Sequence, residues 1–286
     1  MKSSNPVFSR WGAGRADAPA GAYPRHPVGA TVGGPPAGDH SVNPYAPAVV
    51  ADGRTAAAPT AITMDDVVVR TATALGTVVL AAVLSWLLLP VDEAHIGRSY
   101  GLAVGAAVVA FVLSVVQSFR RTPSPALILG YAAFEGVFLG VFSSATSTYI
   151  APGVVVQGVL GTFAVSAGVL IAYRMRWIRV TRRFAGFAAA AATGFLLLLA
   201  ADLLFSAFDA GNGLGLHSGG LGIVFGVLGI LLGAAFLALD FRQVEDAVAY
   251  GAPREEAWLA AFGLTATLAW LYLEVLQVLT IFNGDG

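Results

Sequence analysis

Seven long apolar stretches follow one another through most of this chain, and they constrain its fold more than any other feature. An α-helix needs about 20 apolar residues to cross the hydrocarbon layer of a bilayer, and each stretch is near or above that length. Short separators carrying Pro, Gly or charge divide them. The stretches cover roughly residues 67–89, 100–119, 126–148, 154–175, 184–208, 219–241 and 257–282. The sequence therefore predicts an all-α membrane protein, a seven-transmembrane-helix bundle.

Composition excludes several other classes of protein. Charged residues make up only 12% of the chain, whereas soluble domains carry about 25%. There is no cysteine, which rules out disulfides, thiolate catalysis and cysteine metal sites. No metalloprotease, intramembrane-protease or phosphate-loop motif is present, and no basic cluster has interleaved aromatics. We therefore expect no enzyme, no cofactor and no nucleic-acid partner.

The first 62 residues differ from the rest. They are rich in Pro, Gly and Ala and show no apolar periodicity, a composition that cannot offset the entropy of ordering the chain. We predict a disordered cytoplasmic tail over residues 1–62 and a transmembrane domain over residues 63–286. Thr63 and Asp66 have the spacing of a capping box, which marks the start of the first helix.

The distribution of basic residues predicts the orientation. If the N-terminus is cytoplasmic, every lysine and arginine except Arg98 falls on the cytoplasmic side, as the positive-inside rule requires. We expect a multi-pass protein of a bacterial plasma membrane, with its C-terminus outside. Small residues four apart, such as Gly136 with Gly140 and Gly229 with Gly233, allow close helix packing. These ridges favour packing within one bundle, so we expect a monomer or a weak oligomer.

Ionisable side chains within the apolar stretches are the best candidates for function, because each costs a few kcal/mol or more there. From its position along the third stretch, Glu135 should lie near mid-membrane, and Asp202 should be a solvated acid at the outer interface. Asp240 should lie near the inner end of the sixth stretch. Two depths remain open for Glu274: the outer half, or close to the middle if the crossing starts near Gly263. A close pair of Asp240 and Glu274 is one alternative, which periodicity alone does not establish.

Three segments resemble motifs of the Bax inhibitor-1 (YccA-like) family. They are Tyr131-Ala-Ala-Phe-Glu135-Gly136-Val-Phe-Leu-Gly140, Ala238-Leu239-Asp240-Phe241 followed by Gln243, and Trp270-Leu-Tyr-Leu-Glu274-Val-Leu-Gln277. They occur in the family's order, and the resemblance covers about residues 63–282. The tail lies outside these motifs. Together they are more specific than any one of them alone.

The resemblance implies a seven-helix bundle with the last helix near its centre, acting as a pH-sensitive calcium leak. Carried over by motif, Asp240 and Glu274 are the carboxylates of the pH sensor and of a weak, transient calcium site. The family's arginine latch maps to Arg120 or Arg121, which we expect to pair with Asp240. Two departures are a Glu where the family usually has Asp at position 274, and a longer stretch between the two acids.

The expected partners are the lipid bilayer, calcium and protons. An alternative function within the same family requires no ion path. The protein would then be a non-conducting modulator of membrane-bound proteolysis or stress survival, with a membrane protease as a candidate partner. In that case the tail and the inner arginines would carry the contact. A proton-coupled transporter is disfavoured, because no inverted repeat with paired broken helices is visible.

Overall fold

The computed structural model describes residues 61–208, 216 and 218–284, and the predicted disordered tail lies outside this part except for its last two residues. The described residues form seven α-helices and no strand. All seven are long and apolar enough to cross a membrane. The helices are α2 (Met64–Leu88), α3 (Ile96–Phe119), α4 (Pro125–Tyr149), α5 (Val154–Arg174), α6 (Arg182–Ala207), α7 (Gly219–Ala249) and α8 (Glu256–Gly284). The predicted fold class and the seven helices of membrane-spanning length are therefore confirmed among the described residues.

Most helix bounds fall within a few residues of the apolar stretches, and α7 is the exception. Its stretch ends near residue 241, but the helix continues to Ala249. The extension carries Arg242, which pairs with Asp246 one turn later at 3.0 Å. Such pairs stabilise a helix beyond its apolar part. The extension leaves only a short connection before α8 begins at Glu256.

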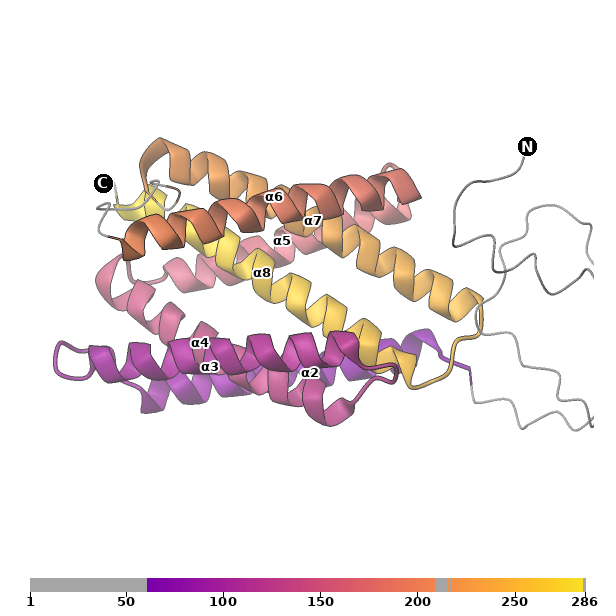
Figure 1. Ribbon diagram of the computed structural model, residues 1–286, viewed down its shortest axis with the longest axis horizontal. Coiled ribbons are helices and arrows are strands. Elements are labelled where there is room, and N and C mark those ends of the chain that lie inside the picture. Colours follow the sequence, from indigo (N-terminus) through magenta and orange to yellow (C-terminus); the bar gives the residue numbers. More distant parts are fainter. Residues whose placement is uncertain (1–60, 209–215, 217, 285–286) are drawn as a thin grey trace, which may run out of the picture. The chain divides into compact units, whose positions relative to one another are not determined.

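Consecutive helices run in opposite directions (Figure 1). The start of α2 and the α3–α4, α5–α6 and α7–α8 connections therefore lie at one end of the bundle. We call it the basic end, because every described arginine except Arg98 lies in these segments or in the helix turns next to them.

The last helix occupies the centre of the bundle. It packs against α2, α4, α5 and α7, and 44% of its most apolar window is buried, as in α4 and α7. By contrast, α3 packs against α4 among the described helices, and α6 packs mainly against α7, with one ring contact to α8 between Phe195 and Trp270. The central position of α8 was predicted from the family resemblance and is confirmed.

Glycines set the closest helix contacts. A Cβ at Gly136 would lie 2.8 Å from the Ala81 Cβ, and one at Gly233 would lie 2.7 Å from a methyl group of Leu271. These positions bring α4 against α2 and α7 against α8. The α3 helix has the same spacing of small residues at Gly101 and Gly105, but a Cβ at either position would meet nothing within 4 Å.

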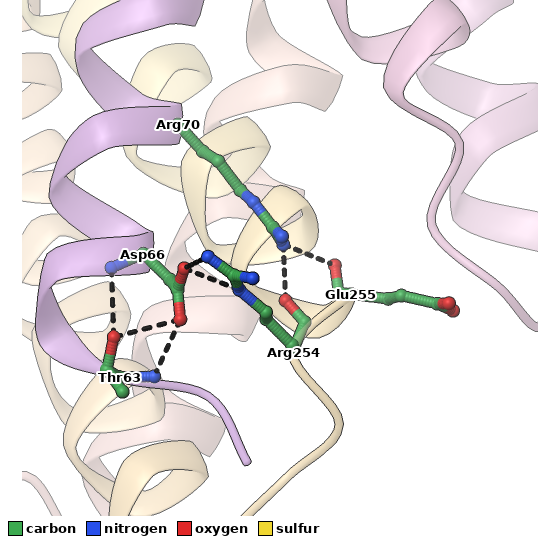
Figure 2. A network of polar contacts seen from close by, with 5 residues as sticks. All are labelled: Thr63, Asp66, Arg70, Arg254 and Glu255. Carbon is green, nitrogen blue, oxygen red and sulfur yellow. Dashed lines mark hydrogen bonds and ion pairs between the residues drawn. The ribbon is translucent and has the colours of Figure 1, made fainter. Parts of the chain in front are cut away.

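A polar network joins the start of α2 to the α7–α8 connection (Figure 2). The predicted capping box is present: the Thr63 hydroxyl accepts from the Asp66 N–H, and the Thr63 N–H donates to the Asp66 carboxylate. The same carboxylate binds Arg254 at 2.6 Å and raises the pKa of that guanidinium above its ordinary value. Arg70 donates to the carbonyls of Arg254 and Glu255.

Backbone pairing extends this network to the segment before α2. The Ile62 N–H donates to the Ala252 carbonyl at 2.8 Å, and Ala61 forms an isolated β-bridge with Pro253. The chain entering α2 is thereby held against the α7–α8 connection. Any displacement of this entry segment would act directly on the two helices that carry Asp240 and Glu274.

Replacing Arg254 by Gln should loosen this attachment locally. The Asp66–Arg254 ion pair would be lost, so the Ile62 amide should exchange its hydrogen faster, as measured by hydrogen–deuterium exchange with mass spectrometry. Amides in the middle of α4 should keep their native rate. High salt should narrow the difference between the two proteins, because it screens the ion pair, whose Arg254 side chain is exposed in the native protein. Arg98→Gln at the opposite end is the charge-matched control, and equal exchange in both variants would contradict the prediction.

Candidate functional site

Asp240 lies on α7 and faces α8. The Thr267 hydroxyl of α8 donates a hydrogen bond of 2.6 Å to its carboxylate. Gly263, one turn earlier on α8, leaves the space that the carboxyl occupies, since a Cβ there would lie 3.1 Å from Oδ1. A small residue and a hydroxyl on α8 therefore accommodate this acid at the helix interface.

A hollow of about 300 Å³ connects Asp240 with the basic end of the bundle. It is formed by the last turns of α7 and the first turns of α8. Its polar lining residues are Asp240, Gln243, Asp246, Tyr250 and Glu256. The hollow therefore presents carboxylates to any cation that enters from this end, with Asp240 as the lining acid deepest in the membrane-spanning part of α7.

Glu274 is more deeply enclosed. Only 8% of the residue is exposed, and its carboxyl lies against the backbone of α7 at Gly229, where a Cβ would be 2.8 Å from Oε1. Its Oε2 atom has no hydrogen-bond partner among the described residues. An ionised carboxylate in such a place would be strongly unfavourable without water or a cation.

The two acids share one helix interface but lie at different levels of it. Asp240 bonds Thr267, and Glu274 lies seven residues further along α8, about 10 Å at the helical rise. On α7, Gly229 precedes Asp240 by eleven residues, about 16 Å. The close pair that would share a proton is therefore not formed in this structure. The physical reason is the antiparallel packing of the two helices: Asp240 lies nine residues before the end of α7 and Glu274 lies eighteen residues after the start of α8, which places the acids two to three turns apart.

The third candidate, Glu135, lies on α4, away from the interface of α7 and α8. Tyr131, one turn earlier, packs edge-on against Phe262 of α8 with ring centroids 5.1 Å apart. Glu135 is half-buried and has no hydrogen bond or ion pair with another described residue. The structure therefore places it on a central helix but does not join it to Asp240 or Glu274.

The predicted arginine latch is not formed. Arg120 and Arg121 are exposed at the α3–α4 connection, and the hydrogen-bond partner of Asp240 is Thr267. Because α3 packs only against α4 among the described helices, its end does not contact α7. The arginine on α7 itself, Arg242, pairs with Asp246 instead.

The interpretation of Asp202 as a solvated helix-end acid was wrong. The residue is 5% exposed, because its side chain faces the protein from the last turns of α6. It lies on α6, which packs against α7 and, through the Phe195 and Trp270 rings, against α8.

Sequence reasoning missed the residues that receive the two acids. Thr267, Gly263 and Gly229 stand opposite Asp240 and Glu274. One signal could have identified Thr267: it precedes Glu274 by seven residues, so both lie on the same face of α8. Gly229 was recognised only as a packing position.

The described residues contain no group of three His, Asp or Glu side chains placed to hold a metal ion. Comparison with protein-family models then supplies the classification, since residues 5–284 match the family described as Bax inhibitor 1 like. The chain belongs to this family. The match is wider than the motifs suggested, because it includes nearly all of the segment before residue 63. No curated protein matches the chain.

Family membership and the seven apolar helices together identify a multi-pass membrane protein of the Bax inhibitor 1 type. Two of the three motif segments, those of Asp240 and Glu274, face each other across α7 and α8. The third packs between α2 and α8, with Gly136 against α2 and Tyr131 against α8.

Proposed function

We propose that this Bax inhibitor 1 type protein is a pH-sensitive calcium leak whose path follows the interface of α7 and α8. The observation that carries the proposal is the placement of Asp240 and Glu274. One acid stands at a hollow open to the basic end. The other is enclosed further along the same interface without a cationic partner among the described residues.

In this proposal the structure corresponds to the closed, protonated state. A neutral Glu274 carboxyl fits against Gly229, and a neutral Asp240 carboxyl accepts from Thr267. Loss of the protons leaves two buried negative charges that the apolar interface cannot solvate. Water and cations must then enter, which requires α7 and α8 to move apart.

The chemistry of the site suits a hard cation held briefly. Calcium prefers six to eight oxygen ligands, whereas each acid offers two carboxylate oxygens. Because the acids are two to three turns apart, a calcium ion would meet them one after the other and keep most of its water. Weak binding of calcium at two successive positions favours its conduction over its retention. Calcium flux in proteoliposomes tests the proposal.

We further propose that the basic end faces the cytoplasm of a bacterial cell. Single cysteines test this cleanly, because the native chain contains none. A cysteine replacing exposed Arg121 should react with a membrane-impermeant maleimide only after the inner membrane is opened. A cysteine replacing exposed Glu93, in the α2–α3 connection, should react in intact cells. The reverse labelling pattern would show that the basic end faces away from the cytoplasm.

A non-conducting modulator remains the second candidate, and one observation favours it. The α5–α6 connection carries five exposed arginines, Arg174, Arg176, Arg179, Arg182 and Arg183, without an ion pair to a described acid. Trp177 among them is 73% exposed. Such a surface fits an acidic partner. Two results together would favour this candidate over the leak. Deleting residues 1–60 or neutralising these arginines would abolish the protein's function in the cell. The variant that lacks both Asp240 and Glu274 would keep that function in full.

A further inference from the structure

The α5–α6 connection concentrates positive charge at the basic end of the bundle. Within ten residues it carries five exposed arginines, Arg174, Arg176, Arg179, Arg182 and Arg183. The chain has no Asp or Glu from residue 136 to residue 201, and none of the five arginines forms an ion pair with a described acid. Their charge is therefore open to an anion outside the bundle.

The connection is packed against the bundle, and its side chains alternate between the core and the outside. Ile178 and Val180 are half-buried and contact the core cluster that includes Val244 of α7. Trp177 and Arg179 are exposed, and the exposed fraction of Trp177 is 73%. The packing of the two aliphatic side chains therefore fixes an aromatic ring and a guanidinium group on the outer side of the connection.

Arg176 has a backbone conformation that is usually occupied by glycine. Its φ is 59°, and it is the one non-glycine residue with a positive φ in the described part of the chain. It closes α5: its N–H donates to the Tyr173 carbonyl, and the Trp177 N–H donates to the Ala172 carbonyl, both at 2.9 Å. Glycine is usual at this position of such a cap, because a Cβ is disfavoured there. Arginine at position 176 therefore lowers stability, which favours a role for its charge outside the fold.

The arginines lie at the depth of the lipid headgroups. The 21 residues of α5 span about 31 Å at the helical rise, close to the thickness of the hydrocarbon layer. Arg174 is the last residue of α5, and Arg182 is the first residue of α6. At these positions the nearest anions are the phosphates of phospholipids. The exposed Trp177 supports the same depth, because tryptophan is enriched at membrane–water interfaces.

We propose that the α5–α6 connection binds the headgroups of anionic phospholipids in the leaflet at the basic end. Guanidinium groups bind phosphate oxygens through paired N–H donors. The positive-inside rule accounts for basic residues at this end, but it requires neither an exposed Trp177 nor an arginine with a left-handed backbone. A soluble acidic protein would also complement the charge, whereas the membrane depth and Trp177 favour the lipid. The proposal does not rest on calcium conduction.

Native mass spectrometry of the full chain in detergent tests the proposal. The probes are phosphatidylglycerol and phosphatidylcholine with the same acyl chains, added in equal amounts, and the native protein should bind more phosphatidylglycerol. In Arg179→Gln with Arg182→Gln, the ratio of bound phosphatidylglycerol to phosphatidylcholine should fall about fivefold or more. One basic residue near an anionic surface contributes about 1 kcal/mol, which corresponds to that change. Lys at both positions keeps the charge and should restore most of the preference.

Two further variants separate headgroup binding from general charge and from folding. Arg120→Gln with Arg121→Gln also removes two exposed arginines at the basic end, and it should change the lipid ratio less, because that connection has no larger cluster of arginines. Arg176→Gly removes one charge and relieves the backbone. It should lower the lipid ratio while leaving the thermal unfolding temperature unchanged or higher, whereas a purely structural role for Arg176 would lower that temperature.

Three results would overturn the proposal. Equal binding of the two lipids by the native protein would show that no anionic headgroup is preferred. An equal fall of the lipid ratio in the two double Gln variants would assign the preference to the net charge of the basic end. Displacement of phosphatidylglycerol by equimolar glycerol phosphate or by an acidic peptide would assign the arginines to a free phosphate or to a protein partner. All of these readouts are independent of flux, so they do not bear on the leak.

Discussion

Calcium flux into proteoliposomes of the native protein is expected to rise as the pH is scanned from about 6 to about 8, by at most about tenfold per pH unit for each acid, since one pH unit changes the ratio of ionised to protonated carboxyl tenfold. The double variant Asp240→Asn with Glu274→Gln should show low flux that does not vary with pH. Both amides keep the size of the native side chains but cannot ionise. The measurement is dye-reported calcium entry at matched protein density.

The single variants distinguish two mechanisms. If the acids shared one proton, either substitution alone would remove the pH dependence. Because the structure separates them by two to three turns, each single variant should keep a shallower pH dependence from the remaining acid. Glu93→Gln, which removes an exposed charge in the α2–α3 connection, is the matched control and should behave as the native protein. Absence of calcium flux at every pH in folded native protein would reject the leak.

Gly140→Ala should strongly destabilise the bundle. Gly140 of α4 faces α2, and a Cβ there would lie 2.8 Å from the Ala82 carbonyl carbon and overlap the Ser85 hydroxyl. Backbone atoms cannot move aside without separating the two helices. Overpacking of this kind costs about 1–3 kcal/mol, and Gly140→Leu should cost more. Thermal unfolding in detergent, followed by the aggregation temperature, measures the loss.

Gly105→Ala is the matched control. It also replaces a glycine of a small-residue ridge, but a Cβ on α3 meets nothing within 4 Å. Its unfolding temperature should be unchanged or slightly higher, because Ala favours a helix over Gly by about 0.5–1 kcal/mol. If both variants lost stability equally, close packing of α2 and α4 would not be the cause of the effect at Gly140.

The helices and their number followed from the sequence because the bilayer imposes a length on each apolar stretch. The start of α2 was also predictable, since the Thr63–Asp66 box is a local interaction between neighbouring residues. The end of α7 was harder to place. Its extension to Ala249 depends on polar residues with pairs such as Arg242–Asp246, which hydropathy does not detect.

The candidate site was only half predictable. Motifs identified Asp240 and Glu274 as the acids to examine, and the structure places both between α7 and α8. Their separation could not be obtained from spacing along the chain, because it depends on where α7 ends, where α8 starts and how the two helices are offset. The arginine latch failed for a similar reason: α3 lies at the periphery, against α4.

The sequence by itself determined the membrane-spanning class, the helix order, the family motifs and the concentration of arginines at one end. These properties depend on hydrophobicity, length and local patterns, which each segment carries independently. Tertiary structure alone decided which glycines make close contacts, that Asp202 is buried, and that the two acids occupy different levels. These properties arise from the packing of helices distant in sequence, and no single segment encodes them.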